Sequence, residues 1–304
     1  MRKKLFLGII MVSTTMLLFA CKANHSEEED KTASKQTDHN EKNETKKDIK
    51  KDVINVEELC IQNGENTIYG KLYVPVEEGK HPVIILSHGY NGTNNDFVNE
   101  CKYYAQNGYL AYAFDFCGGS GGSKSTGKTT DMTIFTEKSD ILAIFDYFQT
   151  MENVDKEQIF LFGGSQGGLV TALAAEERAE KVKGMILYFP AFSIPDDWRK
   201  NYPDIEKIPE TVDFWGLKLG RNFFTDIHDF YTFDNIGSYD KDVLILHGDR
   251  DEIVPLSYSV EAQKKYPHAE LITMNGEGHG FSPTGANMAK EKVLEYLQKH
   301  TDSN

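Results

Sequence analysis

A serine flanked by glycines at residues 163–167 has the spacing expected of an enzymatic nucleophile. The segment Gly-Gly-Ser-Gln-Gly, centred on Ser165, follows a short apolar run at 159–162 and precedes a stretch of helical character. On a tight turn from a strand into a helix, the serine hydroxyl is exposed and only glycine fits at the two flanking positions. The Gln166 N–H, at the start of that helix, would face an oxyanion formed at the serine. The alternative is an ordinary glycine-rich turn.

Two later segments carry a general base and an acid to orient it. His279 lies between two glycines after an apolar run at 269–274, on a loop from which an imidazole can reach a serine hydroxyl. Another apolar run, at 243–247, is followed by Asp249 and Asp251. We favour Asp251 as the partner of His279 because it lies farther past the strand end, whereas Asp249 is placed to cap the turn. Serine, acid and histidine then follow the chain order typical of this nucleophile turn.

The loop after the apolar run at 83–86 is predicted to supply a second donor to the oxyanion. The Tyr90 N–H follows Gly89, whose backbone freedom suits a close approach to the nucleophile. Losing one such donor costs about 3–4 kcal/mol in the transition state. His88, in the same loop, is expected to brace the backbone by hydrogen bonds rather than to titrate during catalysis.

The elements that position these motifs alternate between strands and helices. This alternation predicts a mostly parallel, doubly wound α/β sheet with helices on both faces, in which ligands bind at the carboxyl ends of the strands. A hairpin turned at Asn63-Gly64 precedes the alternation. The expected strands are 54–62, 67–75, 83–86, 109–114, 159–162, 184–189, 243–247 and 269–274, and the expected helices are 95–107, 136–150, 166–179, 256–266 and 285–299.

Residues 190–240, between the sixth and seventh predicted strands, form an irregular stretch rich in aromatic residues. It contains Trp198 and Trp215, the two tryptophans of the chain. An insertion at this place would cover the nucleophile as a lid. We expect its rings to line an acyl pocket suited to flat or apolar acids. The alternative for any single ring is a place in the lid's own core.

Four motifs, taken in chain order, resemble those of the alpha/beta-hydrolase superfamily over nearly all of residues 55–300. They are His88-Gly89-Tyr90, the pentapeptide around Ser165, His247-Gly248-x-x-Asp251 and Gly278-His279. The resemblance implies an alpha/beta-hydrolase fold with a lid insertion between strands six and seven. It also implies hydrolysis by a triad of Ser165, Asp251 and His279.

Three shorter segments resemble bacterial cinnamoyl (feruloyl) esterases, namely Phe114-Asp115-Phe116, Ser165-Gln166-Gly167-Gly168 and Gly278-His279-Gly280-Phe281. This resemblance implies cleavage of carboxylic esters, often hydroxycinnamates on plant polysaccharide, without metal or cofactor, and with oxyanion donors at Tyr90 and Gln166. The chain departs from that family at Gly164, where histidine is usual, and at Tyr90, where phenylalanine is usual. Both departures bear on substrate preference.

One motif points to a different chemistry. Residues 122–129, Gly-Ser-Lys-Ser-Thr-Gly-Lys-Thr, match the phosphate-loop pattern, in which Lys128 would contact phosphate and Thr129 a magnesium ion. A phosphate loop leaves its strand directly and opens a helix, whereas several residues separate the predicted strand end at Phe114 from this segment. We therefore expect a surface loop here rather than the site of an NTPase.

The first 20 residues have the charge order of a secretory signal. A basic cluster at residues 2–4 precedes an apolar run that is short for a membrane span. The run ends in Leu18-Phe19-Ala20-Cys21, which resembles the lipobox of bacterial lipoproteins. That resemblance implies a lipid on Cys21 and a location on the extracytoplasmic side of the bacterial cell membrane. The alternative is simple cleavage and secretion.

Residues 21–52 are mostly charged and polar, which predicts a flexible tether between the lipid and a catalytic domain at 53–304. The formal net charge is −14, with the excess of acid in that domain. Because such a surface repels phosphate, nucleic acid is not an expected partner. The expected partners are a small-molecule or polysaccharide-linked ester and, through Cys21, the membrane.

Three cysteines remain once Cys21 carries lipid, and an odd number cannot all pair within the chain. We expect Cys60, Cys101 and Cys117 to be free thiols buried in strands and a helix, with a catalytic role for Cys117 as the alternative. Besides an esterase, the sequence leaves open a peptidase or amidase, an acyltransferase, and a non-catalytic surface-binding lipoprotein.

Overall fold

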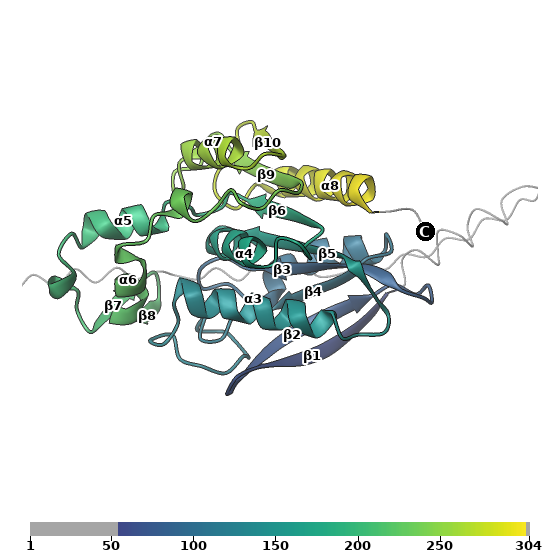
Figure 1. The fold of residues 1–304 in the computed structure, drawn as a ribbon, viewed down its shortest axis with the longest axis horizontal. Coiled ribbons are helices and arrows are strands. Elements are labelled where there is room, and N and C mark those ends of the chain that lie inside the picture. Colours follow the sequence, from purple (N-terminus) through teal and green to yellow (C-terminus); the bar gives the residue numbers. More distant parts are fainter. Residues whose placement is uncertain (1–53, 302–304) are drawn as a thin grey trace, which may run out of the picture. The chain divides into compact units, whose positions relative to one another are not determined.

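The computed structural model describes residues 54–301, which are built on an eight-stranded sheet in the order β1-β2-β4-β3-β5-β6-β9-β10 (Figure 1). β2 runs antiparallel to both β1 and β4, and the remaining neighbours are parallel. This confirms the predicted, mostly parallel α/β sheet. The strands are β1 (Asn55–Asn63), β2 (Asn66–Val74), β3 (His81–Ser87), β4 (Leu110–Phe114), β5 (Val154–Gly164), β6 (Gly184–Tyr188), β9 (Val243–Gly248) and β10 (Ala269–Met274).

Helices cover both faces of this sheet because the central strands are apolar on both sides. Val83 and Ile85 of β3 face one core cluster, shared with α3, α4 and α7, while Ile84 and Leu86 face another, shared with α2 and α8. Strands covered on both faces have continuous apolar sequences, which is the pattern that revealed them. The helices are α2 (Val98–Ala105), α3 (Ile134–Phe148), α4 (Gln166–Glu177), α7 (Leu256–Lys265) and α8 (Pro283–His300).

Helix boundaries differ from the predicted ones where a cap or a turn intervenes. The Thr133 side chain accepts hydrogen bonds from two N–H groups of the first turn, so α3 begins at Ile134 rather than at 136. The helix expected at 95–107 is shorter, because the 3-10 helix η1 (Asn94–Phe97) takes up its first residues. These shifts leave the order of the elements unchanged.

The insertion between β6 and β9, which we call the lid, is more ordered than the irregular stretch expected from its sequence (green in Figure 1). Its hairpin turns through Trp215 and Gly216, both at positive φ, 40° and 85°. Such a two-residue turn usually carries Asn-Gly, so a tryptophan concealed the hairpin from prediction. The lid contains α5 (Ile194–Asn201), η2 (Ile205–Lys207), β7 (Thr211–Phe214), β8 (Leu217–Gly220), α6 (Arg221–His228) and η3 (Thr232–Asp234).

The thiols differ from expectation at one position. Cys101 and Cys117 are buried and free, as expected, but Cys60 is exposed. β1 is one of the two edge strands of the sheet, and Cys60 lies on its face opposite the buried Ile61. The prediction was wrong because one face of an edge strand lacks the helical cover that buries a central strand.

The predicted signal, the lipidation site at Cys21 and the tether at 21–52 lie outside the described residues. Across residues 54–301, every helix is too short or too polar to cross a membrane.

Candidate active site

Ser165 lies at the sharp turn where β5 ends and α4 begins. Its backbone has φ 53° and ψ −121°, a conformation that residues other than glycine rarely adopt. A side chain on Gly163 would overlap the backbone of Gly167, and a side chain on Gly167 would overlap the carbonyls of Ser87 and His88. The two glycines therefore allow β5, α4 and the loop after β3 to converge on the serine.

His279 joins Ser165 to Asp251. Its Nε2 lies 2.9 Å from Ser165 Oγ, and its Nδ1 lies 2.8 Å from Asp251 Oδ2. The three residues follow β5, β9 and β10, and the serine and the histidine are 114 positions apart in the chain. The Phe189 ring packs against the imidazole, with centroids 4.6 Å apart. Because Nδ1–H donates to a carboxylate, Nε2 is the nitrogen left to accept a proton from the serine.

Asp251, and not Asp249, contacts His279. The Asp251 side chain is fully buried, and its Oδ1 accepts hydrogen bonds from the Ile253 and Val254 N–H groups, both at 2.9 Å. Burial favours the neutral acid, but these hydrogen bonds and the one to His279 outweigh it and lower the pKa of Asp251. Asp249 is exposed and accepts a backbone N–H from the loop after β10 at 2.6 Å, in the manner of a turn cap.

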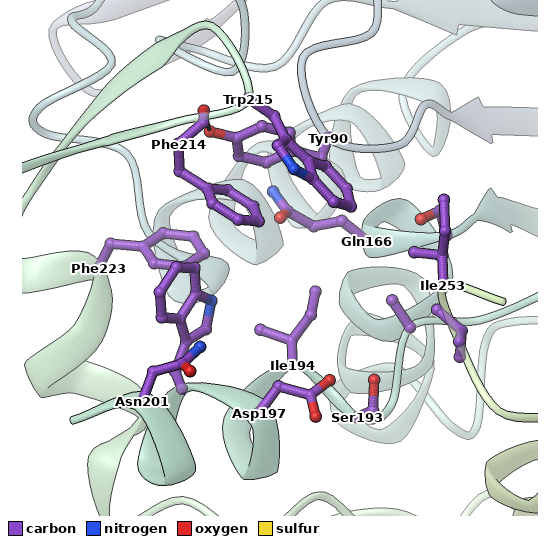
Figure 2. Close-up of a pocket in the computed structure, with 14 residues that line it drawn as sticks. Tyr90, Gln166, Ser193, Ile194, Asp197, Asn201, Phe214, Trp215, Phe223 and Ile253 are labelled. Carbon is purple, nitrogen blue, oxygen red and sulfur yellow. Dashed lines mark hydrogen bonds between the residues drawn. The ribbon is translucent and has the colours of Figure 1, made fainter. Parts of the chain in front are cut away.

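Tyr90 and Gln166 both line the pocket that contains Ser165 (Figure 2). Within the described chain neither backbone N–H is engaged by another residue. Gly89 packs against the nucleophile, because a Cβ built on it would lie 3.1 Å from the Ser165 Cβ. The geometry therefore leaves two unengaged donors near the serine, on the two segments named by the sequence.

His88 holds the loop that carries Tyr90. Its buried ring donates from Nδ1 to the Gly89 carbonyl at 2.7 Å and accepts at Nε2 from the Phe116 N–H at 3.1 Å. Burial lowers the pKa of His88, so the ring is neutral and its two partners fix the proton on Nδ1. These bonds tie the loop after β3 to the chain after β4.

Glu137 of α3 belongs to the surroundings of the site, although no motif in the sequence predicted it. Its buried carboxyl accepts a hydrogen bond from Gln166 Nε2 at 2.8 Å, and burial raises its pKa to about 8. The acid thus holds the side chain of a residue whose N–H lines the pocket. One signal was available: Glu137 shares a helix face with the apolar residues Ile134 and Ile141.

A cavity of about 240 Å³ opens beside Ser165 (Figure 2). Two polar side chains of α5, Asp197 and Asn201, lie along one wall, opposite Tyr90. Another lid ring, Phe224, is buried against the lid rings Trp198 and Tyr202 and does not line the cavity. Some aromatic residues of the lid therefore line the pocket and others form the lid's own core, as the two sequence-based interpretations allowed. The rings that the lid contributes to the cavity are Trp198, Phe214, Trp215 and Phe223.

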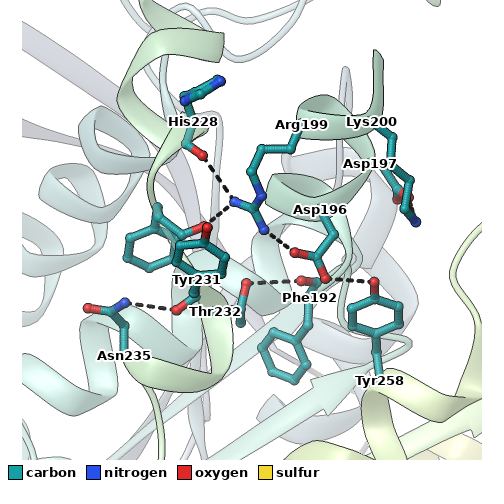
Figure 3. Close-up of polar contacts among 11 residues, drawn as sticks. Phe192, Asp196, Asp197, Arg199, Lys200, His228, Tyr231, Thr232, Asn235 and Tyr258 are labelled. Atoms are coloured by element: carbon teal, nitrogen blue, oxygen red, sulfur yellow. Dashed lines mark hydrogen bonds and ion pairs between the residues drawn. The ribbon is translucent and has the colours of Figure 1, made fainter. Parts of the chain in front are cut away.

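Helix α5, which contributes Asp197 and Trp198 to the cavity lining, is held by polar contacts of Arg199 and Asp196. Figure 3 shows these contacts. The Arg199 guanidinium pairs with Asp196 and donates to the carbonyls of His228 and Phe230, at 3.2 and 2.7 Å. Asp196 also accepts a hydrogen bond at 2.8 Å from the hydroxyl of Tyr258 on α7. This network links the lid's two helices to each other and to the body of the domain.

Neither a phosphate loop nor a metal centre accompanies this cavity in the described residues. The segment 122–129 opens no helix, because α3 begins at Ile134, and the Thr129 hydroxyl donates to the Lys218 carbonyl of the lid at 2.7 Å. The NTPase interpretation therefore lacks the helix N-terminus that phosphate binding requires. Residues 54–301 also contain no group of three or more His, Cys, Asp or Glu side chains placed to hold a metal ion.

Known proteins share both this fold and parts of this sequence. The chain is 26% identical over 221 residues to alpha/beta hydrolase domain-containing protein 17C of Xenopus tropicalis, covering 69% of this chain and 60% of that protein. It is 28% identical over 134 residues to caffeoylshikimate esterase of Arabidopsis thaliana, covering 43% of this chain and 40% of that enzyme. The chain thus spans about 60% of the length of the first of these curated relatives.

Among solved structures, Est1E from Butyrivibrio proteoclasticus with ferulic acid bound is similar to this chain with a TM-score of 0.74 and 31% identity. The match covers 80% of this chain and 98% of that one. The model of the prolyl oligopeptidase family matches residues 95–304, which include the turn at Ser165 and the loops of Asp251 and His279. The chain therefore belongs to the prolyl oligopeptidase family, within the alpha/beta-hydrolase superfamily.

Proposed function

We propose that this protein is a serine carboxylesterase that forms an acyl-enzyme on Ser165. The observation that supports it most directly is the line of hydrogen bonds from Ser165 through His279 to Asp251, at 2.9 and 2.8 Å. An alcohol needs a base within hydrogen-bond reach to become a nucleophile, and that base needs an acid that fixes its tautomer. The buried, ionised Asp251 meets the second requirement.

In the proposed reaction His279 Nε2 takes the proton of Ser165 as the hydroxyl attacks the ester carbonyl. The N–H groups of Tyr90 and Gln166 stabilise the oxyanion, and the imidazolium then protonates the leaving alcohol. Water, activated by the same imidazole, attacks the acyl-enzyme and releases the acid. The reaction uses water as its co-substrate and no cofactor.

We further propose that the acyl group is aromatic, as in a hydroxycinnamate. Flat rings of the lid line the cavity beside Ser165, and Asp197 and Asn201 offer polar partners to a ring hydroxyl. The similarity to a structure that holds ferulic acid, and to a caffeoylshikimate esterase, supports the same class of acid. The alcohol is proposed to be a small molecule or a polysaccharide, since the cavity wall at Trp215 and Ile253 is exposed to solvent.

A panel of cinnamoyl, other aryl and short-chain acyl esters, hydrolysed by the full chain, tests this proposal. We expect the highest kcat/KM for the cinnamoyl esters, labelling of Ser165 by a fluorophosphonate, and loss of both in Ser165→Ala. Labelling together with a clear preference for acetyl esters would retain the serine hydrolase and reject the aromatic acyl group. A chain that folds yet neither labels nor turns over any ester would reject the enzyme altogether.

A peptidase is the second candidate, because the family that matches this chain is named for an oligopeptidase. The same triad would cleave an amide, with His279 protonating the leaving amine. Paired substrates with one acyl group, joined either to an aryl alcohol or to an aryl amine, separate the two functions. An anilide turned over as fast as its ester would favour the peptidase.

We also propose that the protein is anchored by lipid at Cys21 to the extracytoplasmic face of the bacterial membrane. The basic cluster, apolar run and Leu-Phe-Ala-Cys end of residues 1–21 support this, since acyl chains alone can hold a protein to a bilayer. Growth with a labelled fatty acid should label the wild-type chain and not Cys21→Ser. An unlabelled wild-type chain in the culture medium would favour simple secretion.

A further inference from the structure

A second histidine touches the acid of the triad. His247, in β9, is fully buried, and its Nε2 lies 3.1 Å from Asp251 Oδ2 and 3.0 Å from the Val254 carbonyl oxygen. Its Nδ1 lies 2.7 Å from the hydroxyl of Ser259, a buried residue of α7. The ring therefore bridges the end of β9, the turn that carries Asp251 and the helix that follows.

The partners of His247 define where its proton lies. Both neighbours of Nε2, the Asp251 carboxylate and the Val254 carbonyl, can only accept, so Nε2 carries a hydrogen. That N–H donates to the Val254 carbonyl, and Asp251 Oδ2 lies 3.1 Å from the same nitrogen. Burial lowers the pKa of His247, which makes the ring neutral and leaves Nδ1 as an acceptor. The Ser259 hydroxyl then donates to Nδ1.

Both oxygens of the Asp251 carboxylate therefore have N–H groups beside them. Its Oδ1 accepts from two backbone N–H groups, and its Oδ2 accepts from His279 Nδ1–H. The polar Nε2–H of His247 lies 3.1 Å from the same Oδ2. The backbone bonds alone would leave the carboxylate able to rotate about the axis through Oδ1. The His247 N–H comes from β9, a strand hydrogen-bonded on both sides, and a polar N–H fixed beside Oδ2 opposes such a rotation.

We propose that His247 is a positioning residue, whose Nε2–H fixes Asp251 Oδ2 in line with His279. This inference rests on the proposed serine hydrolase function, and it adds a fourth side chain that does not touch the substrate. Loss of this contact should lower kcat and leave KM unchanged. A displacement of about 1 Å in a catalytic group costs on the order of 10²-fold in rate, whereas the acyl pocket stays intact.

The matched variants are His247→Gln and His247→Asn, which are both polar and of similar bulk. A glutamine amide reaches the place of Nε2 and can still donate to Asp251, whereas an asparagine amide reaches only the place of Nδ1, beside Ser259. We expect His247→Gln to keep kcat close to wild type and His247→Asn to lose roughly 10²-fold in kcat with KM unchanged. Equal kcat in the two variants would overturn the inference.

His81 supplies the control for losing a buried histidine. Its ring bonds the carbonyls of Glu77 and Gly108, at 3.0 and 3.1 Å, at the amino end of β3. We expect His81→Asn to lower the melting temperature without lowering kcat. If His247→Asn does not fold, Ser259→Ala replaces it as the test. Without the Ser259 hydroxyl the orientation of the His247 ring is less restrained, so we expect kcat to fall several-fold while KM stays unchanged. An unchanged kcat in Ser259→Ala would overturn the inference.

The same measurements separate this inference from the proposed function. A wild-type chain that fails to label at Ser165 and hydrolyses no ester removes the function, and His247 then has no acid of a triad to position. A wild-type enzyme that is active, with His247→Gln and His247→Asn equally active, removes only the inference.

Discussion

The Asp251 carboxylate bonds His279 through one oxygen, whereas Asp249, two positions earlier, bonds the loop after β10. This makes the two acids a matched pair. We expect Asp251→Asn to lower kcat by roughly 10⁴-fold, because an amide favours the wrong imidazole tautomer. Asp249→Asn should stay close to wild type. Ester turnover of the two variants checks this, and equal losses would contradict the choice of Asp251.

Glu137 gives the protein a stability that depends on pH. In the unfolded chain a glutamate ionises near its ordinary pKa of about 4.3, whereas in the folded chain burial raises the pKa of Glu137 to about 8. At a pH between these two pKa values, Glu137 is ionised in the unfolded chain and protonated in the folded chain. The free energy of unfolding contributed by this group is therefore highest at acid pH, falls as the pH rises from about 4 to about 8, and levels off above.

Glu137→Gln tests this pH dependence. The substitution keeps a hydrogen-bond acceptor for Gln166 and removes the titration, so we expect a flatter loss of stability between pH 5 and pH 8 than in the wild type. One pKa unit corresponds to about 1.4 kcal/mol, so the difference should reach a few kcal/mol. Urea unfolding at the two pH values measures it, with Glu291→Gln on the surface of α8 as the control for net charge. Parallel pH curves for wild type and Glu137→Gln would refute the argument.

At the scale of elements, the lid's rings divide into those that face the cavity and those that do not. Phe214 lines the cavity and packs against Tyr90 and Trp198, whereas Phe230 packs against Phe135 of α3 away from it. We expect Phe214→Ala to lower kcat/KM for a cinnamoyl ester about tenfold more than for an acetyl ester, since it removes apolar contact with the acyl group. Phe230→Ala should leave that ratio unchanged. A shift of the ratio in Phe230→Ala alone would contradict the cavity's role.

The elements of the body were predictable because their signals are local. Continuous apolar runs such as 83–86 identify strands covered on both faces, and the start of α3 needs only Thr133 and the apolar face behind it. The lid was not predictable to the same degree. Its hairpin turns on Trp215 rather than on a residue that favours positive φ, so the information lies in the packing of that ring against Phe214 and Tyr90.

At the scale of the whole molecule, parallel strands explain why a site assembled from distant residues was visible in the sequence. β5, β9 and β10 all end at one edge, so motifs that follow strands in the chain meet in space. The contacts of Glu137 and His247 were not visible in this way. They depend on which face of α3 meets α4 and on how the turn after β9 folds back, and neither follows from a strand's position.

Thiol chemistry reports the integrity of the whole domain. Burial raises the pKa values of Cys101 and Cys117, while Cys60 is exposed on the edge strand. In a Cys21→Ser chain we expect one cysteine to react rapidly with a maleimide and two to react only after unfolding in urea. Cys60→Ser should abolish the rapid phase, as mass spectrometry of the labelled protein would record. Rapid labelling of all three thiols would contradict the described packing.

The backbone of Ser165 has a positive φ, a conformation that suits glycine, and this conformation lowers the thermal stability of the protein. Ser165→Gly relieves a distortion of about 1–3 kcal/mol, whereas Ser165→Ala removes the hydroxyl and keeps the distortion. Of two equally inert proteins, the glycine version should melt several degrees higher in calorimetry. The working enzyme would then be less durable than its own dead variant, and a search for thermostable mutants that ignores turnover would tend to discard the nucleophile itself.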